Sequence, residues 1–224
     1  MTFTPSIITI NVQKCLMNFA NENEIKTEDE LAAMQQKAAL ALKNVLEILE
    51  IDTQSDHNTM DTAQRIAKMW IYEKFKGRYL PPPKITVFPN VKKIDQLMTI
   101  GPINLKSTCS HHFVDFVGHC WIGIIPGDNL IGLSKYARIV DWFARRPQIQ
   151  EELTAQITHW IEETLQPKGV AVMIRAKHLC CCTRGVEDEQ MEFVTTEIRG
   201  VFRTHASTKT EFYNQVNLLE KTPK

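Results

Sequence analysis

The stretch that decides the fold is VAVMIRAKHLC, residues 170–180. Successive side chains of a strand point to opposite faces of its sheet. From Val170 onward every second position is apolar, and the same series ends at His178 and Cys180. We therefore expect a strand with one buried face that runs into a functional site, with His178 and Cys180 on the same side.

Further strands are expected on both sides of this stretch. Val117-Gly118 predicts a turn before one of them, and the Pro-Gly-Asp-Asn sequence at 126–129 predicts a turn after it. The expected strands cover residues 85–88, 96–100, 103–106, 119–125 and 193–203.

Helices are expected around these strands. Thr27 with Glu30, and Thr208 with Glu211, have the spacing of a capping box, and Ser134 has the character of an N-cap. Gly77 is a typical residue just after a helix end. The expected helices cover residues 28–50, 60–76 up to Gly77, a segment opening at Ser134, 148–165 and a segment opening at Thr208.

The whole pattern predicts an α+β protein with an antiparallel sheet, helices on one face and an N-terminal helical pair. We expect an N-terminal arm over 1–26, a helical region over 27–80 and the catalytic domain over 81–224.

The charge balance gives no sign of a nucleic-acid partner. The 224 residues carry 26 basic and 26 acidic side chains, whereas nucleic-acid binders usually show a basic excess. The sequence lacks a long apolar stretch and the features of a signal peptide, so we expect a cytoplasmic protein with no membrane partner. In a reducing compartment, consecutive cysteines such as those at 180–182 favour metal ligation or burial over a disulfide framework.

A candidate metal site combines two segments. Cys109 and His112 have a C-x-x-H spacing, and Cys180 can add a second thiolate. Three protein ligands are typical of a catalytic zinc with an open position for water, whereas a structural zinc usually has four. Cys181 or Cys182 could serve as that fourth ligand, and buried thiols with no metal are the remaining alternative.

Two groups of side chains flank the candidate site. His111 and His178 are not needed as ligands, and imidazoles can move protons near neutral pH. Five cations could bind an anionic substrate if they converge. If they do not converge, they are solvated surface charges. They are Arg65, Lys68, Lys135, Arg138 and Arg184.

Taken in order, these segments resemble the GTP cyclohydrolase I family over residues 28–215. The resemblance rests on five motifs. They are RIAKM at 65–69, STCSHH at 107–112, GLSK at 132–135, RRPQIQE at 145–151, and HLC at 178–180 with Arg184-Gly185.

The resemblance implies a tunnelling (T-) fold assembled into a ring, typically a homodecamer of two stacked pentamers. It implies hydrolysis of GTP to 7,8-dihydroneopterin triphosphate and formate, with one Zn²⁺ per subunit. The product would enter a pterin, folate or 7-deazaguanine pathway. The alternative is a catalytically silent ring-forming relative that binds a nucleotide or a protein partner.

The resemblance also implies a role for each site residue. Cys109, His112 and Cys180 correspond to the zinc ligands. His111 and His178 correspond to the catalytic histidines. Ser134 lies near the ribose and triphosphate. The remaining correspondences are substrate contacts: Arg65, Lys68, Lys135, Arg138 and Arg184 to the triphosphate, and Glu151 assisted by Gln150 to the guanine.

Three features depart from the family pattern. Ser110 stands where the family usually has Glu, Cys181 and Cys182 are untypical, and the segment 187–192 is unusually acidic. We expect that acidic segment to face solvent, because it would otherwise oppose binding of a triphosphate. None of these changes removes a zinc ligand or a catalytic histidine.

Overall fold

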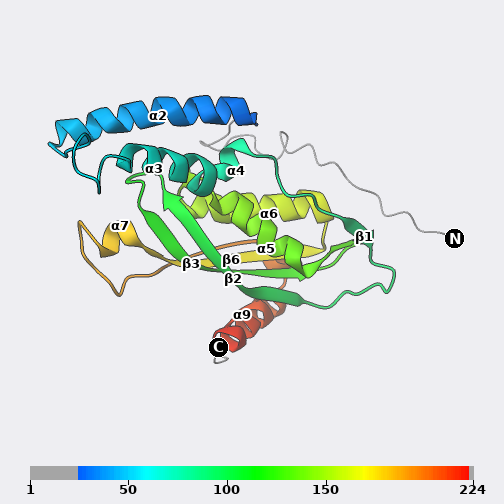
Figure 1. Cartoon of the computed structure of the whole chain (residues 1–224). Coiled ribbons are helices and arrows are strands. Elements are labelled where there is room, and N and C mark those ends of the chain that lie inside the picture. Colours follow the sequence, from blue (N-terminus) through cyan, green and yellow to red (C-terminus); the bar gives the residue numbers. More distant parts are fainter. Residues whose placement is uncertain (1–24, 222–224) are drawn as a thin grey trace.

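The computed structural model describes residues 25–221, so the arm expected over 1–26 lies almost wholly outside the described residues. The described part has layers (Figure 1). The helical pair α2 (Glu28–Ile48) and α3 (Thr62–Met69) lies over α5 (Leu133–Ala144) and α6 (Gln150–Leu165), which in turn cover a sheet. The helix α9 (Ala206–Lys221) lies beneath the sheet.

Within the described residues the main sheet has five strands in the order β5-β2-β3-β6-β7. Neighbouring strands are antiparallel, except that β5 pairs parallel with β2. A separate two-stranded sheet pairs β1 (Val87–Pro89) with β4 (Asn129–Ile131). The strands of the main sheet are β2 (Met98–Cys109), β3 (Asp115–Ile125), β5 (Pro147–Gln148), β6 (Gly169–His178) and β7 (Phe193–Gly200).

The decisive stretch forms β6, and its alternation is confirmed. Val170, Val172 and Ile174 are fully buried in the core beneath α5 and α6. Each such side chain contributes on the order of 1.5–3 kcal/mol through burial. These contacts fix the register of β6 against β3, in which His178 lies opposite Phe116.

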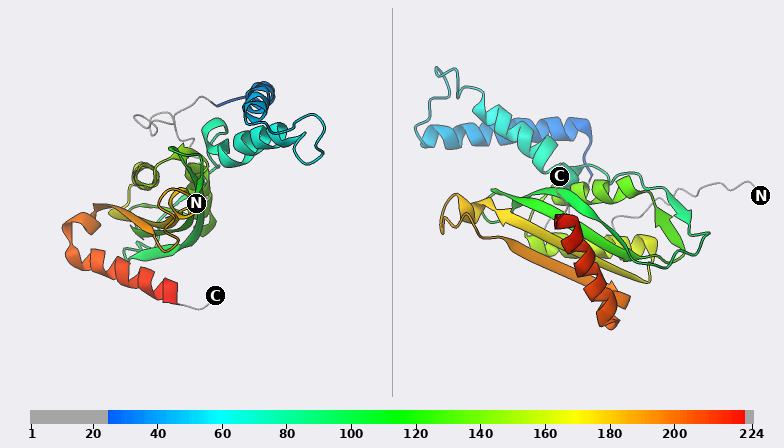
Figure 2. Two further views of the ribbon diagram at one scale, coloured as in Figure 1. Left: turned by 90° about the vertical axis from the view of Figure 1, so that its left-hand side faces the viewer. Right: turned by 90° about the horizontal axis from the view of Figure 1, so that it is seen from below.

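The other face of the sheet is covered as well. Ala171 and Met173 of β6 pack with Trp121, Phe212 and Val216, the last two from α9. Figure 2 shows α9 lying across the strands on the side away from α5 and α6. The α+β tunnelling fold is confirmed. Helices were expected on one face of the sheet only, whereas α9 covers the other face as well.

Several predicted strand limits are wrong. The strands expected at 96–100 and 103–106 form one strand, β2, with an irregular register between Ile100 and Ile103. Pro102 lies in this gap, and a proline has no N–H for the ladder. The turn expected at Val117-Gly118 is instead the middle of β3, where a side chain on Gly118 would collide with the Arg175 carbonyl oxygen.

The predicted start of the first helix is confirmed, and the predicted end of the second helix is not. Thr27 and Glu30 form the capping box: the Glu30 N–H donates to Thr27 Oγ1 at 3.3 Å, and the Thr27 N–H donates to Glu30 Oε2 at 2.7 Å. The second helix does not end at Gly77. It continues from α3 into the π-helix η1 (Trp70–Lys74) and the short α4 (Lys76–Tyr79), which contains Gly77.

Three further helix ends differ from the predictions. The N-cap of α5 is Gly132, so Ser134 lies in the first turn. Cys180 is not on the strand but in the short helix α7 (Leu179–Cys182), because the chain turns immediately after His178. The last strand ends at Gly200 and is followed by α8 (Val201–Thr204). The next helix, α9, begins ahead of Thr208, so the capping box predicted there does not form.

Candidate metal centre

A tight hairpin and a short helix bring the predicted metal ligands together. Cys109 ends β2, and the hairpin to β3 closes through hydrogen bonds from Phe113 N–H to the Cys109 carbonyl and from Cys109 N–H to the Val114 carbonyl, both 2.9 Å. His112 lies in this hairpin. Cys180 comes from α7, next to the hairpin because β6 pairs with β3.

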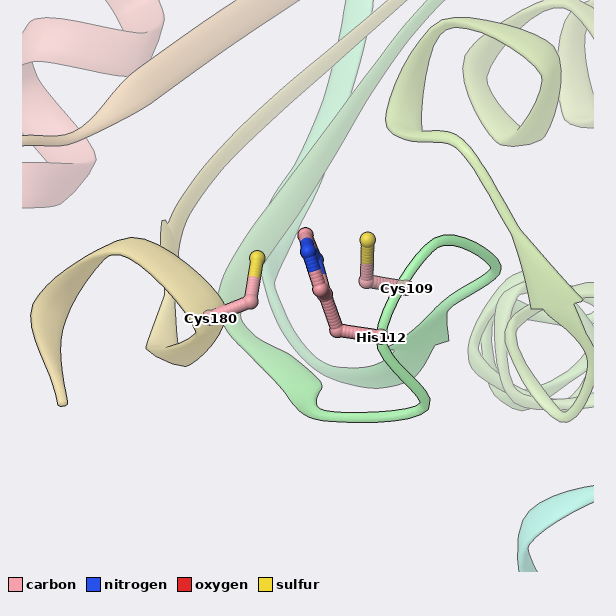
Figure 3. Close-up of side chains that lie close together, drawn as sticks. All are labelled: Cys109, His112 and Cys180. Atoms are coloured by element: carbon pink, nitrogen blue, oxygen red, sulfur yellow. The ribbon is translucent and has the colours of Figure 1, made fainter. Parts of the chain in front are cut away.

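The three expected ligands converge. One ligand atom from each of Cys109, His112 and Cys180 lies within 4.8 Å of the other two (Figure 3). Both thiols are buried, whereas His112 is exposed. Two thiolate sulfurs and an imidazole nitrogen are ligands that zinc accepts, and a three-residue set leaves one position open.

The electrostatics of the two thiols also fit a cation. Burial, together with the neighbouring Cys109 thiol, raises the pKa of Cys180 to about 12. The Cys180 thiol therefore stays protonated unless a positive charge lies beside it. A divalent cation would offset this cost, because it stabilises thiolates directly.

His111 lies beside the thiols but outside the converging group. Its Nδ1 is 3.8 Å from the sulfur of Cys109, and its ring is exposed. An exposed imidazole at this edge can exchange protons with solvent and with a bound molecule.

His178 is held more firmly than His111. Its ring stacks on Phe116 at 4.7 Å and 6°, and meets the edge of Phe193 at 5.9 Å. Its Nε2 lies 3.0 Å from Oε1 of Gln150. Burial lowers the pKa of His178, while the charge of Glu151 opposes that change in part. The neutral ring is thus favoured at neutral pH.

Gln150, expected to assist Glu151 at the guanine, has several partners within the protein. Its side chain is fully buried, and Nε2 donates to the carbonyl oxygens of Ile174 and Phe193, each at 3.1 Å, and to Oγ1 of Thr195 at 3.0 Å. These acceptors fix the amide orientation, so Oε1 faces His178 as an acceptor. The His178 nitrogen that faces it must carry the proton. Gln150 is therefore placed to orient His178.

The predicted substrate cations come from three parts of the chain: Arg65 and Lys68 from α3, Lys135 and Arg138 from α5, and Arg184 from the segment after α7. In residues 25–221, no hydrogen bond or ion pair joins any of them to the three ligands. Arg65 pairs with Asp61 on its own helix at 3.3 Å, and the Lys135 ammonium donates to the Lys84 carbonyl at 3.3 Å. Arg138 lines a separate cavity of about 420 Å³. Lys68, Arg184 and Glu151 are exposed, as is Ser134.

The sequence analysis missed the residues that support the hairpin. Lys74 of η1 forms an ion pair with Asp115 at the start of β3, and Phe113 packs against aromatic rings of the helical region. Trp70, Lys74 and Phe75 come to lie on one side of the helix only because the turn is widened in the structure. The acidic segment 187–192 is exposed, as expected.

The fold and the donor set define an α+β tunnelling-fold protein with a candidate zinc centre. Comparisons with known proteins point to one family. The sequence profile of GTP cyclohydrolase I matches residues 38–217. GTP cyclohydrolase 1 of Wigglesworthia glossinidia brevipalpis is 45% identical over 177 residues, covering 79% of this chain and 82% of that protein. GTP cyclohydrolase 1 of Salmonella arizonae is 41% identical over 191 residues, covering 84% and 86%.

The chain belongs to the GTP cyclohydrolase I family, which confirms the expected family and enzyme class. Among solved structures, the apo archaeosine synthase QueF-Like matches with a TM-score of 0.38 and 14% identity, covering 48% of this chain and 94% of that one. This likeness is too weak to support an argument. No helix in residues 25–221 is both long and apolar enough to cross a bilayer.

Proposed function

We propose that the protein catalyses the zinc-dependent hydrolysis of GTP to 7,8-dihydroneopterin triphosphate and formate. The convergence of Cys109, His112 and Cys180 next to two further histidines carries the proposal. The catalytic unit spans 81–224, with a helical region over 27–80 and an arm over 1–26. The cytoplasm, where thiols stay reduced, suits this ligand set.

One zinc per subunit would be held by Cys109, His112 and Cys180. When bound, zinc supplies Lewis acidity that lowers the pKa of a water molecule toward about 7. His112 is the exposed member of the set, so a substrate would reach the site from the side of His112.

The guanine end of the substrate is assigned to Glu151. Guanine presents two neighbouring donors, the N1–H and the exocyclic amino group, and one carboxylate can accept from both. Glu151 is exposed in the first turn of α6, directly after Gln150, whose side chain contacts His178. A base held by Glu151 would therefore lie close to the His178 ring.

The histidines are assigned the proton transfers. Addition of water at C8 opens the imidazole ring of guanine, and the adjacent ring nitrogen must gain a proton. His178 or His111 delivers it, because both rings lie next to the thiols or on the strand that leads to them. A second hydrolysis releases formate, and ribose opening and ring closure need further proton transfers, to which the hydroxyl of Ser134 contributes.

The triphosphate is assigned to the five cations. Arg65, Lys68, Lys135, Arg138 and Arg184 together would match a charge near −4. Since they come from separate parts of the chain, and Arg65 and Lys135 have local partners, we propose that neighbouring subunits of a homodecameric ring supply several of them. A mixed ring of two inactive variants, Lys68→Ala and Glu151→Ala, should then regain activity. Absence of any recovery would count against shared sites.

The central experiment measures pterin formation by the zinc-replete protein. GTP is supplied, and the product is read as pterin fluorescence after oxidation, with Cys109→Ala and His111→Ala in parallel. Formation of pterin by the wild type alone supports the proposal. One bound zinc per chain without pterin would favour the silent relative and direct attention to Ser110 and Cys181. The product would serve a pterin, folate or 7-deazaguanine pathway.

A further inference from the structure

The hairpin that carries His111 and His112 is gripped from the helical region. The ring of Phe113, the residue after His112, lies 5.7 Å from the ring of Trp70 and 5.5 Å from that of Phe75, in an edge-on contact with the latter. Such tilted and edge-on pairs are the favourable geometries for aromatic rings. Phe113 nevertheless remains 45% exposed, so this contact is not ordinary core packing.

An ion pair reinforces the grip on the next strand. The Lys74 ammonium lies 2.5 Å from both carboxylate oxygens of Asp115. Asp115 also accepts a hydrogen bond from the Thr108 hydroxyl at 3.0 Å, and Thr108 is its partner across β2 and β3. Both charged side chains are partly shielded from solvent, with exposed fractions of 23% and 32%. A shielded pair of this kind is screened less than one on an open surface.

A local irregularity of the helix makes both contacts possible. The Phe75 N–H donates to the Trp70 carbonyl at 2.8 Å, which is the i to i+5 bond of a π-helix. The widened turn places Trp70, Lys74 and Phe75 toward the hairpin together. Single-turn π-helical segments within α-helices occur frequently at functional sites.

The backbone of the hairpin adopts a conformation that other contacts have to stabilise. Phe113 adopts a φ of 56°, a left-handed conformation that is uncommon for a residue with a side chain. His111, His112 and Phe113 are all exposed. A residue in this conformation persists only where the surroundings hold it.

We propose that Trp70, Lys74, Phe75, Phe113 and Asp115, named the hairpin clamp, are positioning residues that hold His112 against the two thiols. The metal centre to which this applies is that of the proposed function. The helical region thereby takes part in building the metal site, although it contributes no ligand. Loosening the clamp should weaken metal binding while leaving the rest of the fold in place.

Cobalt binding is the test, because Co²⁺ replaces zinc at such sites and reports thiolate ligation through its absorption bands. Metal-free protein is titrated with Co²⁺ for the wild type, Phe113→Ala and Asp115→Asn. We expect about tenfold weaker binding in each variant, the lower end of the effect of residues that orient metal ligands. The matched controls are Phe88→Ala, where the ring is 40% exposed, and Asp128→Asn, which breaks the exposed ion pair with Lys93. Both should bind Co²⁺ like the wild type.

Rescue separates positioning from general damage. The charge-swapped double variant Lys74→Asp with Asp115→Lys should recover most of the Co²⁺ affinity that either single change loses, and Phe113→Leu should lose less than Phe113→Ala. Unchanged Co²⁺ affinity in Phe113→Ala and Asp115→Asn, with thiolate bands present in the wild type, overturns the clamp and leaves the proposed function standing. A wild type without thiolate bands overturns the metal centre and the clamp together.

Discussion

Replacing Gln150 with leucine should destabilise the protein far more than the loss of one surface amide would. The substitution keeps a side chain of similar size, so it creates little cavity. It removes the hydrogen bonds from Nε2 to Ile174, Phe193 and Thr195, and the contact between Oε1 and His178. Gln150 is fully buried and its contact with the Ile174 carbonyl is buried as well, so water does not readily replace it there.

The magnitude follows from the number of bonds. Two N–H groups serve three acceptors, which together with the His178 contact amounts to about three full hydrogen bonds. At roughly 1 kcal/mol net for each, the free energy of unfolding should fall by about 3 kcal/mol. The midpoint of urea denaturation, followed by tryptophan fluorescence at one fixed protein concentration, measures this change.

The same helix offers a matched control. Gln156 is also buried in α6, and its Oε1 has no hydrogen-bond partner among the described residues. Gln156→Leu should therefore change the free energy of unfolding by less than about 1 kcal/mol, because it removes an unsatisfied buried group. If Gln150→Leu lowers the free energy of unfolding no more than Gln156→Leu does, the hydrogen bonds from Gln150 to β6, β7 and His178 do not stabilise the fold, and the argument is refuted.

Three other outcomes are expected. In the metal-free protein, the free energy of unfolding should fall as pH rises from about 9 toward 12. The reason is that the pKa of Cys180 is raised from 9.0 to about 12, so that its thiol favours folding only while protonated. Cys180→Ala should make the free energy of unfolding less dependent on pH in this range. His112→Ala should reduce zinc affinity at least tenfold in a chelator competition, whereas His111→Ala should change it less than about threefold, because only His112 converges with the thiols. Gly77→Ala should lower the thermal midpoint clearly, since its Cβ would collide with the carbonyl oxygen of Trp142.

Local chemistry accounts for what could be predicted of the fold. The capping box at Thr27 and the alternation along β6 depend on neighbours in sequence, and both are confirmed. The errors arose where distant segments decide. Gly77 and Gly118 look like helix-end and turn residues, yet they are glycines because the backbone near Trp142 and Arg175 approaches them closely.

In the candidate site, too, features that depend on short segments were predictable and long-range contacts were not. Spacing was enough to propose Cys109, His112 and Cys180 as one ligand set, because a C-x-x-H pair and a strand-end cysteine are chemical signals within short segments. The support of that set was not predictable. Lys74 and Asp115 are ordinary charged residues in the sequence, and only the fold brings them together.

The sequence by itself determined the residue types that chemistry requires, the period of each strand and helix, and the family resemblance. The tertiary structure decided how these residues are oriented and what holds them. It places the Gln150 side chain against His178, a contact that the sequence did not suggest, and it puts Cys180 in a helix rather than on the strand. The physical reason is that side-chain hydrogen bonding and close packing depend on which distant segments meet. Those contacts form only when the strands pair and the helices pack on the sheet.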